Sequence, residues 1–346
     1  MTTIFVHVAA YRDAECLPTI LDLFQKAAHP RNISVGLCWQ FLPGVESDTL
    51  DFGSFNDRVR VVSIEAAKTG GVCWARNLAQ QFFNDEDYVL QIDSHMRFVP
   101  NWDELMCREL SRCEYPKAAL TCNPPPYHPP DQLEPNPRPM VKRASPLVPP
   151  GDIRCTAEYL DVYPEAPVLS AFVSGAFVFA GGELIRQVPY DPWLYFNQEE
   201  ITYSMRLYTH GWNVYCPSRV LIYHHYFGLP ANTPTRPRHW QDYNGWGEYQ
   251  KIGKARFNHL SRYSVSADPN VLIDLEKYSL GNVRSIEEYE AFCGVDFRNK
   301  TVSDHGLQLR FVPGIERLRK NPVRIPQTAS PNLTRNTNGP STCSSS

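Results

Sequence analysis

The sequence predicts an α/β protein whose mostly parallel central sheet is covered by helices on both faces. The first hundred of its 346 residues alternate short apolar runs with segments of helical spacing. Repeats of strand, helix and strand place parallel strands side by side and helices over them. Apolar residues make up 42% and charged residues 21% of the chain, ordinary values for a folded protein that exclude global disorder.

Four short segments carry the pattern of strands. Residues 3–9, 59–64 and 88–92 are short and rich in apolar side chains, and apolar residues recur at every second position in 33–39. Runs of this kind are typical of strands buried in a sheet. Helical segments separate several of these strands, which is why most are expected to run parallel.

Three segments carry helical spacing instead. Residues 18–28 place their apolar side chains on one face, and residues 70–84, which open on two glycines and close at an asparagine, do the same. A third helix opens on Glu199 and Glu200 and ends before Gly211, with apolar residues at intervals of three and four. Such spacing is that of an amphipathic helix.

The net charge and the cysteines of the chain indicate which classes of partner and which cellular compartment to expect. The 34 Lys and Arg against 37 Asp and Glu give a net charge of −3, which argues against nucleic acid or an anionic membrane as the main partner. The longest apolar tract, 168–182, is shorter than a membrane span, and the chain opens on a strand rather than a leader peptide. None of the ten cysteines forms a C-x-x-C pair, so we expect free thiols and a cytoplasmic protein.

Composition predicts five regions along a chain that is longer than one typical core. An α/β half occupies 1–115, and 116–152 holds twelve prolines by position 150. Because proline interrupts helices and ladders, 116–152 is expected to be a surface loop, either functional or an inert insertion. A second half at 153–230 carries the acidic helix, 231–326 is expected to pack on the core as an extension, and 327–346 is expected to be disordered.

The sharpest motif is Asp93-Ser94-His95, which directly follows the fourth strand. In extended backbone, residues 93 and 95 project to the same face, so both could reach one ion. The carboxyl ends of parallel strands are where α/β sheets bind ligands. A mixed oxygen and imidazole donor set suits a divalent ion such as Mn²⁺. Alone, the motif is equally consistent with a solvated aspartate and a packed histidine.

Two later motifs also have two possible interpretations each. Glu199 and Glu200 either take part in chemistry or only complement the dipole at the helix N-terminus. Residues 220–225 read as an apolar strand that ends in His224 and His225. These histidines either bind a ligand or pack beneath the neighbouring aromatic residues.

In their order and spacing, the motifs resemble the polypeptide α-N-acetylglucosaminyltransferase family, whose members modify hydroxyproline on cytoplasmic proteins. The resemblance covers roughly residues 3–320 and departs from the family in the proline-rich part, 123–150. The matching motifs include Tyr11-Arg12-Asp13, Ala75-Arg76-Asn77, Asp93-Ser94-His95, Ser174-Gly175-Ala176-Phe177, Gln198-Glu199-Glu200, Tyr223-His224-His225 and Tyr289 to Phe297.

The resemblance implies a fold, a reaction and a cofactor. The fold is the GT-A fold of nucleotide-diphospho-sugar transferases with a C-terminal extension. The reaction moves N-acetylglucosamine from UDP-N-acetylglucosamine to a polypeptide hydroxyl, of hydroxyproline, Ser or Thr, with retention of configuration. The cofactor is a divalent metal ion, Mn²⁺.

Roles for individual residues also come from the resemblance. It implies Asp93, His95 and one of His224 and His225 as metal ligands; strand alternation lets only one of the two histidines face the ion, and His224 is preferred. Arg76 would point at phosphate or uracil, with a surface salt bridge as its alternative. Glu199 or Glu200, with Glu199 preferred, would orient sugar or acceptor hydroxyls. The implied donor-binding residues are Tyr11, Arg12, Asp13, Arg76, Asp93 and Ser94.

The sequence is also consistent with two other functions. The chain could be a GT-A transferase with another UDP-sugar or a non-protein acceptor, since polypeptide N-acetylgalactosaminyltransferases share the Asp-x-His pattern. It could also be an inactive protein that binds sugar nucleotides. For a polypeptide acceptor, segment 123–150 is expected to border a groove with Trp193, Tyr195 and Trp240.

Overall fold

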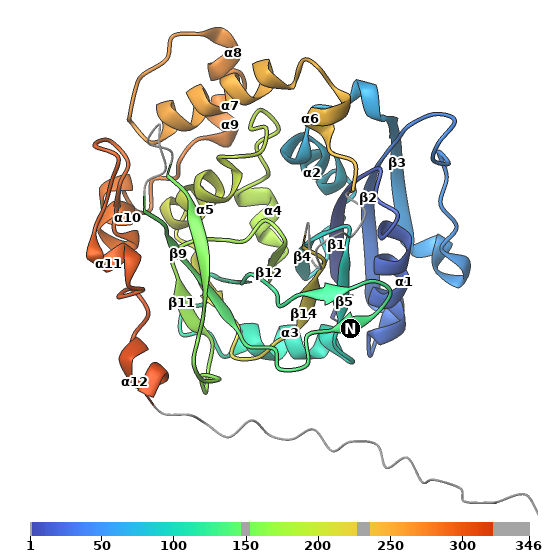
Figure 1. Ribbon diagram of the computed structural model, residues 1–346, viewed down its shortest axis with the longest axis horizontal. Helices are drawn as coiled ribbons and strands as arrows, with labels where there is room; N and C mark the ends of the chain where they lie inside the picture. Colours follow the sequence, from blue (N-terminus) through green and yellow to red (C-terminus); the bar gives the residue numbers. More distant parts are fainter. Residues whose placement is uncertain (1, 147–152, 227–235, 321–346) are drawn as a thin grey trace, which may run out of the picture.

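One eight-stranded sheet forms the centre of the protein, in the strand order β11-β13-β6-β12-β4-β1-β2-β3. We describe it from a computed structural model, over residues 2–146, 153–226 and 236–320 (Figure 1). Strand β12 is antiparallel to both of its neighbours and β11 is antiparallel to β13, whereas the other neighbouring strands pair in parallel. The predicted mostly parallel sheet is confirmed.

The N-terminal half follows the predicted alternation of strands and helices. Alternate residues of β1 face opposite layers: Val6 belongs to the apolar cluster that contains residues of α1 and α3, while Phe5 belongs to the cluster that contains residues of α2 and α4. Helices therefore cover both faces of the sheet. The elements are β1 (Ile4–Tyr11), α1 (Cys16–Lys26), β2 (Ile33–Phe41), β3 (Val59–Glu65), α2 (Val72–Gln80), β4 (Tyr88–Asp93), β5 (Met96–Phe98) and α3 (Trp102–Ser111).

The proline-rich segment 116–152 is not the continuous surface loop that its composition predicts. Its start forms β6 (Ala118–Thr121) inside the central sheet, and β9 (Met140–Ala144) pairs with β10 (Cys155–Tyr159). A short hairpin of β7 (Tyr127–His128) and β8 (Gln132–Leu133) lies between them. The physical reason is local, because a proline removes only its own N–H, and 117–122 and 140–145 contain none.

The second half completes the sheet and adds the acidic helix. Strand β14 (Ile222–His224) does not join the central sheet but pairs antiparallel with β5. Helix α5 lies between α4 and α10 in Figure 1. The remaining elements of this half are β11 (Val168–Ser170), β12 (Phe177–Gly181), α4 (Glu183–Gln187), α5 (Glu199–Thr209) and β13 (Asn213–Cys216).

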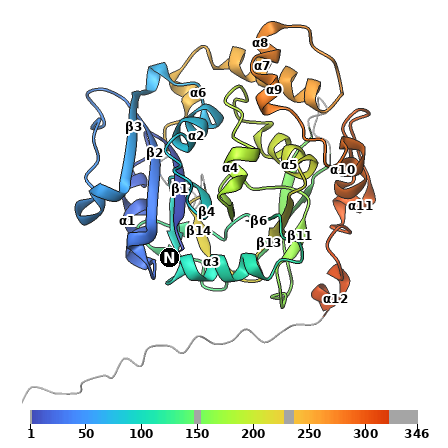
Figure 2. The same cartoon turned by 180° about the vertical axis from the view of Figure 1, so that it is seen from behind.

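The C-terminal part packs on the core in two places. Figures 1 and 2 both show α7 and α8 across one end of the sheet and α10 to α12 along the β11 edge. Phe257, Ile286 and Tyr289 join the main apolar cluster. The elements are α6 (His239–Asp242), α7 (Trp246–Leu260), α8 (Pro269–Leu272), α9 (Leu275–Tyr278), α10 (Ile286–Cys293), β15 (Val295–Asp296), β16 (Thr301–Val302), α11 (Asp304–Leu307) and α12 (Ile315–Lys320). The predicted disordered tail, 327–346, lies outside the described residues.

Two further sequence predictions concern cysteines and membranes. The nine cysteines in the described ranges are free, in agreement with the predicted thiols. Over the same ranges, none of the helices combines the length and the apolar character that crossing a membrane requires.

Candidate active site

Asp93, His95 and His224 meet where the end of β4 in the central sheet adjoins the separate two-stranded sheet of β5 and β14. Asp93 is the last residue of β4, and the chain bends at Ser94 and His95 before β5 begins. The expected extended backbone from 93 to 95 is therefore wrong: a bend brings the two side chains together. His224 arrives on β14, where it pairs with Met96.

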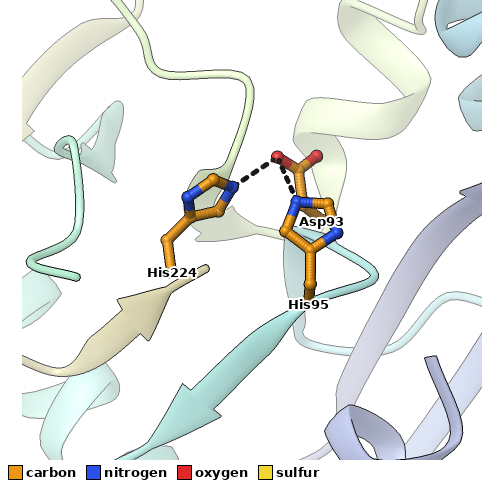
Figure 3. Close-up of side chains that lie close together, drawn as sticks. All are labelled: Asp93, His95 and His224. Carbon is orange, nitrogen blue, oxygen red and sulfur yellow. Dashed lines mark hydrogen bonds and ion pairs between the residues drawn. The ribbon is translucent and has the colours of Figure 1, made fainter. Parts of the chain in front are cut away.

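Both imidazoles approach the same carboxylate oxygen (Figure 3). Asp93 Oδ2 lies 3.2 Å from His224 Nε2 and 3.9 Å from His95 Nε2. One ligand atom from each of the three residues lies within 4.8 Å of the others. His225 is directed elsewhere, because its ring packs against the ring of Tyr127 at 5.8 Å.

Asp13 holds His95 from behind. Its Oδ2 lies 2.6 Å from His95 Nδ1 and accepts a hydrogen bond of 2.7 Å from the Ser94 hydroxyl. Burial works to raise the pKa of Asp13, but the charge and hydrogen bond of His95 lower it to about 2. The ionised carboxylate of Asp13 keeps the imidazole proton of His95 on Nδ1. The Nε2 atom, which faces Asp93, then carries the lone pair that binds a metal ion, the arrangement usual for a metal-bound histidine.

The protonation states of the cluster also suit a cation. Burial lowers the pKa of His224 to about 4, which leaves a neutral imidazole at neutral pH. Burial works to raise the pKa of Asp93, but the contact with His224 and the charge of Arg76 hold it well below its usual range. One carboxylate and two imidazoles form a donor set that fits Mn²⁺ and similar divalent ions.

Arg76 lies between Asp93 and Glu199 instead of pointing freely at a ligand. Its Nη2 donates to Asp93 Oδ1 at 2.6 Å and to the Gly175 carbonyl at 2.7 Å. Its Nη1 pairs with Glu199 and lies 3.2 Å from the Tyr190 hydroxyl. Arg76 is 2% exposed, and both terminal nitrogens of its guanidinium are occupied by protein groups. The alternative interpretation of Arg76, a surface salt bridge, is therefore wrong, because its ion pairs are buried; its role in donor binding stays a prediction.

The two glutamates of α5 have different environments. Glu199 is buried, pairs with Arg76 and accepts a 2.7 Å hydrogen bond from Tyr190. Glu200 Oε1 accepts from the Gly175 N–H at 2.8 Å, and Oε2 pairs with the ammonium of Lys142. Sequence reasoning missed Lys142, because it treated this part of β9 as loop.

Two adjoining cavities meet at the cluster. The first cavity, about 500 Å³, is lined by the ends of β1 and β4, the start of α2 and residues 236–240. The second cavity, about 370 Å³, is lined by Asn123, residues 153–155 and 174–176, and the start of α5. Both cavities are lined by Val72, Asp93, Phe196, His224 and Tyr226. The cluster thus forms part of the wall between them.

Tyr11 and Asp13 line the first cavity as expected, but Arg12 turns away from it. Arg12 has a left-handed φ of 49° and pairs with Glu46 and Asp242. The Tyr11 hydroxyl donates to the same Asp242 at 2.9 Å. The contact network of Arg12 therefore supports the position of Tyr11 at the cavity.

Gly71 controls how closely the aromatic wall of the first cavity approaches α2. Its φ is +97°, and a Cβ there would lie 2.6 Å from the Tyr195 ring. Only glycine meets both conditions without strain. Of the expected acceptor aromatics, Tyr195 and Trp240 line this cavity, whereas Trp193 is directed to Asp274, with 3.3 Å from its indole nitrogen to the carboxylate.

A comparison with solved structures finds this arrangement of elements in GalNAc-T7. The crystal structure of GalNAc-T7 with UDP, GalNAc and Mn²⁺ matches with a TM-score of 0.55 and 13% identity, over 84% of this chain and 56% of that chain. TarS 1–349 of S. aureus matches with a TM-score of 0.42 and 12% identity over 80% of each chain, and its UDP complex with 0.44 and 12%, over 87% and 81%. Curated protein sequences gave no match.

The fold thus defined is the GT-A fold, as expected, and the chain spans little more than half the length of the GalNAc-T7 structure it matches. A family model, Glycosyltransferase (GlcNAc), matches residues 3–52 and 43–299. The chain therefore belongs to the Glycosyltransferase (GlcNAc) family.

Proposed function

We propose that the protein moves N-acetylglucosamine from UDP-N-acetylglucosamine to a hydroxyl of a polypeptide, on hydroxyproline, Ser or Thr, with retention and with Mn²⁺. One observation carries the proposal: in a member of the GlcNAc family, an Asp–His–His cluster lies in the wall between two cavities. The donor sugar, the polypeptide acceptor and retention rest on the family resemblance.

Asp93, His95 and His224 would hold the divalent ion. When bound, the ion supplies the positive charge that neutralises the diphosphate as it leaves. The protein prepares this site with two residues outside the ligand set. Asp13 orients His95 through Nδ1, and Arg76 occupies Oδ1 of Asp93, so that Oδ2 stays directed at the histidines.

The two cavities fit the two ends of a nucleotide sugar. Its diphosphate lies between nucleoside and sugar, so a donor whose diphosphate reaches the cluster extends into both cavities. The first cavity, with Tyr11 and Tyr195, offers aromatic faces for uridine. The second offers carboxylates near the sugar, which stabilise the positive charge of an oxocarbenium-like transition state.

The acceptor would approach over the exposed aromatic residues at the cavity mouths. Phe196 lines both cavities, is 47% exposed and packs against Trp240 at 5.2 Å. Flat aromatic side chains bind extended, proline-containing chains at little entropic cost. Free thiols at the nine described cysteines support a cytoplasmic location for the reaction.

A donor panel tests the proposal. Purified protein is incubated with Mn²⁺ and UDP-N-acetylglucosamine, UDP-N-acetylgalactosamine, UDP-glucose or UDP-galactose, and UDP release is measured without acceptor. We expect fastest release from UDP-N-acetylglucosamine, and an α anomeric coupling in the NMR spectrum of a glycosylated hydroxyproline, Ser or Thr peptide. Faster turnover of another donor would favour a different GT-A transferase, and binding without release would favour an inactive sugar-nucleotide-binding protein.

A further inference from the structure

We propose that Lys142 is a positioning residue that holds Glu200 as the carboxylate facing the donor sugar. The proposal rests on the proposed function. It starts from an asymmetry between two adjacent glutamates, each of which has its own cation. Arg76 pairs with Glu199, and Lys142 pairs with Glu200.

Glu199 has little capacity left for a substrate. Its side chain is 5% exposed, and one oxygen already takes both Arg76 and the Tyr190 hydroxyl. Both glutamates line the second cavity, but the side chain of Glu200 is 36% exposed. Of the two, Glu200 is therefore the carboxylate with more surface open to a sugar in this cavity.

The orientation of Glu200 is set by donors from two different elements. The Gly175 N–H, just before β12, binds Oε1 at 2.8 Å, and Lys142 on β9 binds Oε2. Two donors on two oxygens fix both the plane and the rotamer of a carboxylate. Without Lys142, only the Gly175 contact would restrain it.

Lys142 acts through Glu200 and does not contact the substrate itself. Its side chain is 5% exposed and it does not line the second cavity. A buried ammonium costs free energy of desolvation, and an apolar pair of similar volume often serves stability as well or better. The ion pair is accordingly better explained by the placement of Glu200 than by stability.

The distribution of contacts predicts which kinetic constants change. Lys142 does not line the first cavity, so nucleotide binding should be kept in Lys142→Met. The rate of UDP release from the UDP-sugar should fall on the order of 10- to 100-fold, the range for a lost supporting contact or a misplaced group. Lys142→Arg keeps the charge and should recover most of the rate.

A double-mutant cycle tests the coupling. Lys142→Met, Glu200→Gln and the double variant are compared for kcat and KM of UDP release with Mn²⁺. The matched control is Arg143→Met, which breaks the neighbouring 2.7 Å ion pair to Glu158 on the same hairpin. We expect the double variant to be no slower than Glu200→Gln, and the control to keep the wild-type kcat. Multiplicative losses, or an equal loss in the control, would overturn the proposal.

A binding measurement separates this proposal from the proposed function. The ratio of Kd for UDP to Kd for UDP-N-acetylglucosamine reports the contribution of the sugar. Lys142→Met and Glu200→Gln should reduce this ratio equally, with Kd for UDP unchanged. If the wild type binds the UDP-sugar but releases no UDP, the proposed function is wrong. The ratio of the two Kd values then still shows whether Lys142 positions Glu200 against the sugar. An unchanged ratio in Lys142→Met, or no sugar contribution in the wild type, overturns the role of Lys142.

Discussion

Arg256 and Asp191 form an ion pair with no exposed side-chain surface on either partner. Arg256 Nε donates to Asp191 Oδ2 at 2.6 Å, and Nη1 donates to the carbonyls of Val271 and Ile273. The pair joins α7 to the loop that carries Tyr195 and Phe196 toward α5. The C-terminal part thereby fixes the segment that lines the cavities.

Arg256→Leu should therefore destabilise the protein strongly. It leaves Asp191 buried without its cation, and breaking such a pair typically costs about 3–5 kcal/mol. The measurement is the free energy of unfolding from denaturant titration. Arg262→Ala, which removes an exposed pair with Glu287, should stay close to the wild type. Equal losses in the two variants would contradict this explanation.

Alanine in place of Asp93, His95 or His224 should abolish most Mn²⁺ binding and UDP release, because each removes one donor of the cluster. EDTA should have the same effect on the wild type. The matched control is His225→Ala, since that ring packs against Tyr127; it should keep metal binding. Full activity in EDTA, or a His225→Ala variant as impaired as His224→Ala, would disprove the assignment of ligands.

Asp13→Asn should weaken Mn²⁺ binding about 10- to 100-fold although Asp13 is outside the ligand set. The change removes the carboxylate that orients His95 at Nδ1, and losses of this size are usual for such partners. Titration with Mn²⁺ measures the effect. As a control, Asp242→Asn removes the partner of Tyr11 and Arg12 without touching His95. Equal affinities in the two variants would argue against the supporting role of Asp13.

Stability in EDTA should fall as the solution is acidified below about pH 6.5. Burial first, and the charge of Arg76 second, lower the pKa of His7 from 6.5 to about 3. Between these values the unfolded chain binds a proton that the folded protein does not, so stability increases with pH there. His7→Leu should show a smaller pH dependence of the unfolding free energy than the wild type. A His7→Leu curve parallel to that of the wild type would refute the contribution of His7.

Phe196→Ala should reduce transfer to a polypeptide more than UDP release to water. The exposed ring lies where both cavities open, so its loss removes acceptor contacts while the metal ligands stay in place. The two activities are measured separately with the same donor. Tyr263→Ala, at an exposed aromatic residue that lines neither cavity, is the control. A proportional fall of both activities would place Phe196 in the donor site instead.

Local patterns predicted those parts of the fold and site that depend on neighbouring residues. The spacing of apolar residues predicted the first four strands and the acidic helix. Asp93 and His95 were predicted as site residues because they are polar and directly follow an apolar strand. His224 needed one more fact, the pairing of β14 with β5, which places it opposite Met96.

Contacts across long stretches of chain could not be predicted in this way. Asp13 supports His95 across 82 residues, and Lys142 reaches Glu200 across 58. Nothing in a window of ten residues marks either contact, because each depends on how the strands are ordered in the sheet. The prolines further concealed β6 and β9, whose own residues are ordinary strand formers.

The separation of 131 residues between Asp93 and His224 has a consequence for biosynthesis. A chain still being synthesised holds only two of the three proposed metal ligands until β14 has left the ribosome and paired with β5. High-affinity metal binding would therefore begin only after most of the chain has folded. Metal uptake would then stabilise the finished protein by mass action and leave earlier folding intermediates unaffected.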